Sequence, residues 1–244
     1  MIYYAAKIVD DIEMAKTEEE KQIADERLGF ITPILKAFLT ELGSESANHG
    51  LQIFGGHGFI KEWGMEQIVR DARIATLYEG TTGIQALDLL GRKILLTRGK
   101  SLKAFAKEVL IFCKDRSMIS SNPHKRQMNK FVWPLSKAVA NWQQYSLRLA
   151  MKAKNNRDIV GSASVDYLMY SGYIVMAYFW AQMAQSAYEK LAEGVENRDF
   201  YRAKIKTAEF YFERMLPRTK SLAKTMMADP KTLMQLDQEL LSFS

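Results

Sequence analysis

The sequence contains few residues that cross-link a chain or interrupt helices. Among its 244 residues there are only one cysteine and five prolines. The lone Cys113 excludes an internal disulfide and any metal site built from several cysteines, and such low cysteine use fits a reducing compartment, so we expect a cytoplasmic protein. Cys113 lies among Ile111, Phe112 and Lys114, and we predict a buried structural thiol there rather than a nucleophile. The sparse prolines leave long stretches of good helix formers, which favour an all-α fold.

Long hydrophobic runs are also scarce. Charged residues such as Lys7 and Asp10 interrupt the amino end, so no signal peptide is expected. The stretch from Tyr167 to Tyr188 is uncharged for 22 residues, which is the length of a transmembrane helix. Its serines, glutamines and tyrosines make it more polar than a typical membrane span, so it predicts the most buried helix of a bundle instead. Within it we expect Gly172 to allow a close helix contact and Trp180 to pack inside.

Charge is unevenly distributed along the chain. Residues 1–99 hold 11 Lys and Arg against 15 Asp and Glu, a net charge of −4, whereas residues 100–244 hold 23 against 13, a net charge of +10. A basic half of this kind can meet nucleic acid, an acidic partner protein or a phosphorylated ligand. Because no nucleic-acid-binding motif accompanies the charge, a solvated basic surface is the favoured interpretation, and no nucleic-acid partner is expected.

Glycine divides the chain in the same place. Eleven of the 14 glycines fall at or before Gly99, so the first part contains special turns. Its first helix is expected to bury a stripe that includes Ile2 and Val9, and its second to start at Thr32 with Pro33 in the first turn. The spacing of apolar residues predicts helices over residues 1–16, 32–51, 64–71 and 81–96.

The second part predicts an antiparallel helical bundle. Pro134 either kinks one of its helices or marks the start of that helix. Short polar connections make neighbouring helices antiparallel, and we expect the two domains, residues 1–98 and 99–244, to pack closely. The predicted helices of this part cover residues 101–116, 124–155, 165–192, 197–227 and 233–241.

A glycine cluster in the first part is one candidate for a binding site. It contains Gly55, Gly56 and Gly58 around His57, and no other metal-ligating residue lies at a suitable spacing, so no metal site is expected. Glycines leave the backbone uncovered and allow a flat or phosphorylated ligand to approach closely. A tight turn between two helices is an equally good interpretation of the same residues.

The second candidate is Glu79, a single acid between an apolar run and a glycine. Beside Leu77 and Tyr78 its carboxylate is expected to be poorly solvated, which would raise its pKa and suit it to proton transfer. Alternatively, Glu79 is an acid at a helix amino terminus, where the helix dipole favours it. The residues themselves support the two interpretations equally.

In their order and spacing, these motifs resemble the carboxyl-terminal helical domain of acyl-CoA dehydrogenases. This resemblance covers residues 1–98. Residues 100–244 resemble the additional helical domain of a longer subgroup of the family, which includes the 3-methylmercaptopropionyl-CoA dehydrogenases. The first match is carried by the segments Gln52–Gly58, Arg70–Ile74, Tyr78–Thr81 and Ile84–Gln85, and the second by Phe200–Lys204, Phe210–Arg214 and Leu216–Pro217.

The resemblance implies a role for each matched site residue. Glu79 matches the catalytic base, and its backbone N–H matches a donor that polarises the thioester carbonyl of the substrate. Gly80 matches the substrate-binding glycine. FAD is the implied cofactor, and Thr81 matches a residue that contacts the flavin. Gln52, Gly55 and Gly56 match a segment that reaches the FAD of a neighbouring subunit. One departure is Gly83, because many relatives have a polar residue there, near the flavin.

The resemblance also implies a longer enzyme, of which this chain would be the carboxyl-terminal portion. The expected reaction is α,β-dehydrogenation of an acyl-CoA thioester to the 2-enoyl-CoA, with an electron-transfer flavoprotein as acceptor and a homo-oligomer as the assembly. The domains that supply most flavin and CoA contacts are missing from these residues, so the isolated chain is expected to be inactive. Two alternatives remain: a non-enzymatic helical module for oligomerisation or partner binding, and an acyl-CoA oxidase.

Overall fold

The computed structural model describes residues 1–235 and residue 239, and all the regular structure in these residues is helical. The all-α fold is therefore confirmed. The first part of the chain contains α1 (Ile2–Glu13), α2 (Glu18–Phe54), α3 (Gly56–Phe59), the 3-10 helix η1 (Lys61–Trp63), α4 (Met65–Leu77), α5 (Thr82–Leu87) and the π-helix η2 (Asp88–Leu96).

The second part begins at α6 (Lys100–Asp115), after Gly99 adopts a left-handed conformation with φ 70°. Pro134 lies inside α7, so it does not mark the start of that helix. Of the predicted helix over residues 233–241, only part falls within the described residues, where α11 ends at Met234. The helices after α6 are α7 (Lys125–Asn155), α8 (Asp158–Glu193), α9 (Arg198–Phe210), the π-helix η3 (Tyr211–Met215), the 3-10 helix η4 (Leu216–Arg218), α10 (Thr219–Met226) and α11 (Lys231–Met234).

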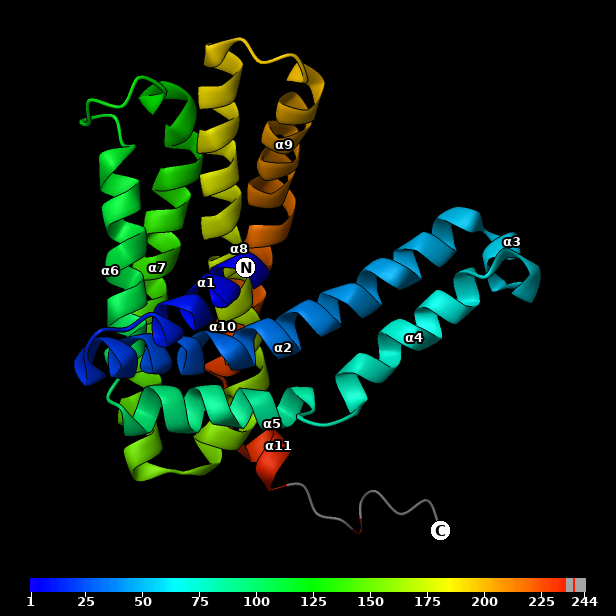
Figure 1. Cartoon of the computed structure of the whole chain (residues 1–244). Coiled ribbons are helices and arrows are strands. Elements are labelled where there is room, and N and C mark those ends of the chain that lie inside the picture. Colours follow the sequence, from blue (N-terminus) through cyan, green and yellow to red (C-terminus); the bar gives the residue numbers. More distant parts are fainter. Residues whose placement is uncertain (236–238, 240–244) are drawn as a thin grey trace.

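The helices form an upright bundle with an arm that extends to one side (Figure 1). The bundle contains α6, α7, α8 and α9, and α5 and η2 pack against α8. The arm, residues 43–77, consists of the end of α2, then α3 and η1 at its tip, and α4, which returns along α2. The glycine cluster therefore lies at the far end of the arm, and Glu79 follows directly after α4, where the chain returns to the bundle.

The long helix α2 begins earlier than its sequence predicts. It starts after Thr17, whose hydroxyl accepts a hydrogen bond from the Glu20 N–H at 3.1 Å, while the Glu20 carboxylate accepts one from the Lys16 N–H at 2.8 Å. These reciprocal bonds are a capping arrangement that satisfies free donors at a helix start. The predicted start at Thr32 is wrong because Pro33 lies in the helix interior, where burial of the flanking Phe30, Ile31 and Ile34 outweighs the loss of one backbone hydrogen bond.

One hydrophobic core spans both parts of the chain, and α8 lies at its centre. The segment from Tyr167 to Tyr188 is the most buried helix, as its sequence predicts. At Gly172, α8 meets Phe38 of α2 so closely that a Cβ atom added to Gly172 would overlap the phenyl ring. The predicted close helix contact at this glycine is therefore confirmed, and it joins the two parts.

Polar side chains reinforce the junction between the two parts. The Glu108 carboxylate pairs with Arg27 and accepts hydrogen bonds at 3.1 Å from the hydroxyls of Tyr4 and Tyr178. Because these four residues come from α1, α2, α6 and α8, the cluster ties both parts together at a second point. The pKa of both tyrosines is raised, first by burial and then by the neighbouring carboxylate.

Two predictions about buried side chains need correction. Trp180 is only half-buried, whereas Trp142 is fully buried and donates from Nε1 to the Tyr167 hydroxyl at 3.1 Å. The stripe predicted for α1 is also wrong in part, since Ile2 and Val9 are exposed and Ile8 is the buried residue. In both cases apolar spacing identifies a helix but not which side faces the core. The thiol of Cys113 is buried as predicted, and burial raises its pKa.

Candidate active site

Glu79 lies in the α4–α5 loop, residues 78–81, where the chain leaves one helix and enters the next. The Tyr78 N–H donates to the Ile74 carbonyl at 3.1 Å and closes α4, and the Gln85 N–H donates to the Thr81 carbonyl at 3.0 Å and opens α5. Between these bonds Gly80 has φ 73°, a left-handed conformation that favours glycine. The loop is therefore a short segment whose two ends are fixed by helices.

Two side chains of α2 hold this loop. The Lys36 ammonium donates to the Ala75 carbonyl at 2.9 Å and lies 5.3 Å from the centre of the Tyr78 ring. On the other side of the loop, the Thr82 hydroxyl donates to a carboxylate oxygen of Glu41 at 2.5 Å. Sequence reasoning missed Lys36 and Glu41, because their partners lie about 40 residues further along the chain and no local pattern connects them.

The Glu79 side chain is exposed, as are those of Leu77 and Tyr78. The expectation that this carboxylate is poorly solvated is therefore wrong for this chain. Leu77 and Tyr78 are its neighbours in the sequence, but their side chains do not cover it in the structure. The backbone N–H of Glu79 donates no hydrogen bond to any residue that the structure describes. The loop thus presents a carboxylate and a free amide donor from the same residue.

The residues that follow Glu79 shape the start of α5. A Cβ atom at Gly80 would overlap only the end of the flexible Gln85 side chain, which can move aside, so the left-handed φ is what favours glycine there. Thr81 is exposed at the N-cap position of α5, and its hydroxyl makes no capping bond. Gly83 lies in the first turn with open space around its Cα. Gly80, Thr81 and Glu79 therefore lie together as consecutive residues of one exposed turn.

The glycine cluster lies at the tip of the arm. Gly55 ends α2 with φ 60°, and neither Gly55 nor Gly56 has any atom within 4 Å of an added Cβ, so their backbone is uncovered. Gly58 differs, because an added Cβ would lie 2.5 Å from the Leu51 carbonyl oxygen. The ligand interpretation thus suits Gly55 and Gly56, and the helix-turn interpretation suits Gly58. Gln52 is exposed in the last turn of α2.

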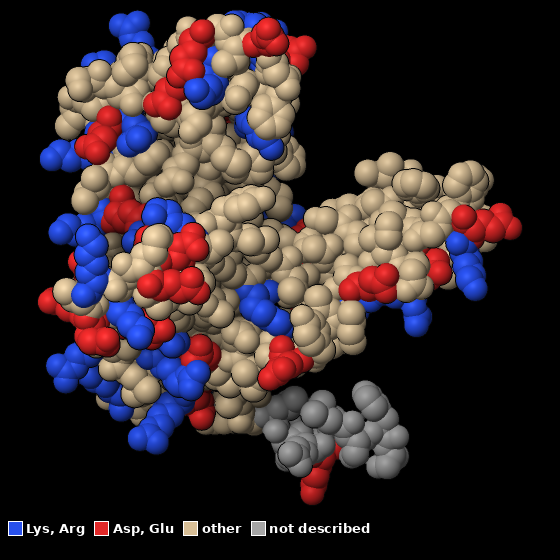
Figure 2. All heavy atoms as spheres, viewed as in Figure 1, with Lys and Arg blue, Asp and Glu red and all other residues tan. Residues whose placement is uncertain are grey.

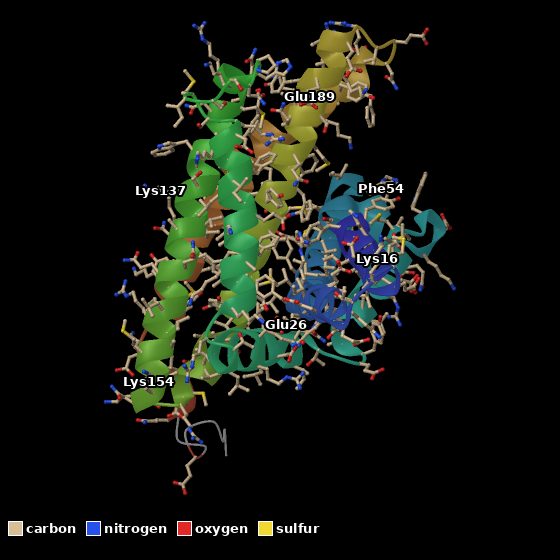
Figure 3. The ribbon with its side chains drawn as sticks, turned by 60° about the vertical axis from the view of Figure 1, so that its left-hand side comes forward. Lys16, Glu26, Phe54, Lys137, Lys154 and Glu189 are labelled. Atoms are coloured by element: carbon tan, nitrogen blue, oxygen red, sulfur yellow. The ribbon has the colours of Figure 1, made fainter. Side chains whose placement is uncertain are left out.

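The two motifs are not brought together in one chain. They lie at opposite ends of α4, whose 13 residues span about 20 Å at 1.5 Å per residue. Figure 3 shows Phe54, at the end of α2, on the opposite side of the view from Lys137 of α7. Gln52, Gly55 and Gly56 therefore lie about the length of α4 away from Glu79.

The upper face of the arm shows few charged side chains in the view of Figure 2, whereas its tip and lower edge carry both acidic and basic ones. His57 makes an edge-to-face contact with Trp63, with ring centres 5.4 Å apart. Among the described residues no cluster of His, Cys, Asp and Glu could hold a metal ion, and none of the helices combines the length and the hydropathy of a membrane span. The large apolar side chains exposed at the tip are Ile53, Phe54, Phe59, Ile60 and Trp63.

Known proteins match both parts of the chain. Residues 1–95 match the family described as acyl-CoA dehydrogenase, C-terminal domain, and residues 104–237 match the family described as acetyl-CoA dehydrogenase C-terminal like. A 3-methylmercaptopropionyl-CoA dehydrogenase of Ruegeria pomeroyi is 34% identical over 199 residues, which cover 82% of this chain and 33% of that protein. A broad-specificity linear acyl-CoA dehydrogenase of Mycobacterium tuberculosis is 28% identical over 84% of this chain and 34% of its own length.

A further relative is a subunit of the caffeyl-CoA reductase-Etf complex of Acetobacterium woodii, which is 31% identical over 91 residues, or 37% of this chain and 21% of that subunit. The chain spans about a third of the length of the dehydrogenases from Ruegeria pomeroyi and Mycobacterium tuberculosis. The matched regions are carboxyl-terminal by their own descriptions, and they take in nearly all of the sequence. The chain therefore belongs to the acyl-CoA dehydrogenase family, with which it shares the carboxyl-terminal helical region.

Proposed function

We propose that this chain works as the carboxyl-terminal part of a flavin-dependent acyl-CoA dehydrogenase that converts an acyl-CoA thioester to the 2-enoyl-CoA. The proposal rests on the α4–α5 loop, where Glu79 combines an exposed carboxylate with an unbonded backbone N–H. Proton removal from carbon needs a positioned base, and it is easier when a donor polarises the adjacent carbonyl. The loop offers both groups within one residue.

In this reaction the α C–H bond breaks and its proton passes to the Glu79 carboxylate. The β C–H bond breaks with both electrons, and a double bond forms between the two carbons. The flavin, when bound, supplies the acceptor for the β-hydrogen as hydride. The Glu79 N–H stabilises the negative charge that develops on the thioester oxygen, and Gly80 leaves the backbone uncovered beside the substrate.

The residues present fit a flavin at two separate places. The Thr81 hydroxyl is exposed without a capping bond, beside the proposed base. Gly55 and Gly56 offer uncovered backbone at the arm tip, with Gln52 next to them. Since α4 separates these places by about 20 Å, we propose that Thr81 contacts one FAD and that Gln52, Gly55 and Gly56 contact the FAD of a neighbouring subunit in a homo-oligomer.

The chain alone would keep the base but lack most of the contacts for FAD and CoA, so we propose that it is inactive by itself. The domain division at residue 98, a cytoplasmic location and an electron-transfer flavoprotein as electron acceptor belong to the same proposal. The relative from an Etf complex supports that acceptor.

The test is anaerobic mixing of the full-length protein with acyl-CoA thioesters of several chain lengths. Bleaching of the flavin without oxygen, followed by transfer to electron-transfer flavoprotein, is the expected result. Rapid reoxidation by oxygen would instead favour an acyl-CoA oxidase. A full-length protein that binds neither flavin nor acyl-CoA would contradict the proposal and favour a non-enzymatic module.

A further inference from the structure

We infer that Lys36 and Glu41 of α2 are positioning residues for Glu79, and that they hold its loop in place relative to the bundle on which α2 packs. The inference rests on the proposed function only in taking Glu79 as the base. The contacts that support it lie on both sides of the α4–α5 loop and join it to a helix that is itself packed against the bundle.

Lys36 holds the end of α4. The Ala75 carbonyl lies in the last turn of that helix, where backbone carbonyls have no partner within the helix. The Lys36 ammonium satisfies this carbonyl at 2.9 Å, and its charge is favourable at a helix carboxyl terminus. The same ammonium lies over the Tyr78 ring, which fixes the residue directly before Glu79.

Glu41 holds the start of α5. Thr82 is the first residue of that helix, and its hydroxyl donates to Glu41 at 2.5 Å. Hydrogen bonds to a charged group are stronger than those between neutral groups. Lys36 and Glu41 are five residues apart on α2, a rise of about 7.5 Å. One rigid helix therefore fixes both ends of the loop and the distance between them.

The bundle in turn holds α2. Phe38 lies between Lys36 and Glu41 in the sequence and packs against Gly172 of α8. Further along α2, Glu45 pairs with Arg218 at 2.8 Å, and the same guanidinium donates to the Tyr173 hydroxyl at 3.0 Å. Residues from both sides of the proposed boundary thus form one continuous set of contacts that ends at Tyr78 and Thr82, on either side of Glu79.

The test measures amide hydrogen exchange by NMR in the full 244-residue chain. The Tyr78 and Gln85 amides report on the two ends of the loop, because the Tyr78 hydrogen bond closes α4 and the Gln85 hydrogen bond opens α5. Lys36→Met should speed exchange of the Tyr78 amide about tenfold, and Glu41→Met should do the same for the Gln85 amide, as losing a bond to a charged group allows local opening. Lys36→Arg should restore protection at Tyr78.

The controls are Lys21→Met and Glu19→Gln, which change exposed residues of the same helix. Both should leave the two reporter amides unchanged. Unchanged exchange in Lys36→Met and Glu41→Met, or faster exchange spread evenly over the whole chain, would overturn the positioning role. If Glu41→Met fails to fold, Thr82→Val removes the donor to Glu41 and is judged at Gln85 in the same way. Amide exchange does not depend on enzyme activity. A failure of the positioning role can therefore be distinguished from a finding that Glu79 is not the base.

Discussion

The phenyl ring of Phe38 occupies the space where Gly172 would carry a side chain. We expect Gly172→Ala to lower the free energy of unfolding by about 1–3 kcal/mol, because a methyl group there forces α2 and α8 apart. Gly43→Ala is the matched control, since it also lies in a helix but has open space around it, and it should stabilise by up to about 1 kcal/mol. Urea unfolding followed by circular dichroism gives both values. Equal effects of the two variants would contradict the close contact.

The two tryptophans of the bundle should differ sharply in their contribution to stability. Trp142 is fully buried and hydrogen-bonded to Tyr167, so Trp142→Ala should cost about 3–5 kcal/mol. Trp180 is half-buried against Tyr211, and Trp180→Ala should cost roughly half as much. The measurement is urea unfolding of each variant beside the parent chain. A larger loss at Trp180 would mean that the side chains are packed differently.

Glu79→Gln in the full-length protein should slow flavin reduction by acyl-CoA about 10²- to 10⁴-fold, because the amide keeps the size of the side chain but not its basic oxygen. Substrate binding should persist, as the backbone N–H is unchanged. Anaerobic stopped-flow bleaching, together with a binding titration, separates the two effects. Glu196→Gln, at an exposed residue in the turn before α9, is the control. Near-normal bleaching of Glu79→Gln would show that another group is the base.

Stability should fall at alkaline pH. Burial is the main cause that raises the pKa of the tyrosines at positions 4, 167, 170, 178 and 211 above the ordinary value. The pKa of a tyrosine in the unfolded chain is about 10, and its pKa in the folded chain is higher. Below about pH 10 both states keep the proton, so the free energy of unfolding is at its full value. As the pH rises past about 10 the unfolded chain loses the proton first, so the free energy of unfolding should fall. Melting temperatures measured across this range, with phenolate absorbance, provide the test. A constant melting temperature would show that these hydroxyls ionise freely in the folded chain.

The isolated chain should associate through the arm tip. Ile53 is 84% exposed and Phe59 is 80% exposed at the arm tip, and such apolar surface is typical of a contact site. Light scattering over a range of concentrations should show oligomers that the double variant Ile53→Ser and Phe59→Ser reduces. Ile119→Ser is the control, because Ile119 is 88% exposed but lies between α6 and α7. A monomer at high concentration would contradict this prediction.

Sequence patterns predicted the fold better than the site. Helix-forming composition and apolar spacing were sufficient for the helices and for the burial of α8, because a helix that is apolar nearly all round has to lie inside. The start of α2 was not predictable from Pro33, whose usual position in a helix is overridden here by tertiary packing. The exposure of Glu79 and its support by Lys36 depend on contacts between distant residues, which no local pattern encodes.

The unbroken course of α2 also restricts how the length of the chain can change. Its 37 residues extend for about 55 Å, from the capping residue Thr17 to the arm tip. One residue inserted between Phe38 and Phe54 would turn everything beyond it by about 100° and displace it by about 1.5 Å, since that is the geometry of each helical step. Gln52 and the glycine turn would then face another direction. Insertions and deletions are therefore expected in the loop over residues 116–124, and not within α2.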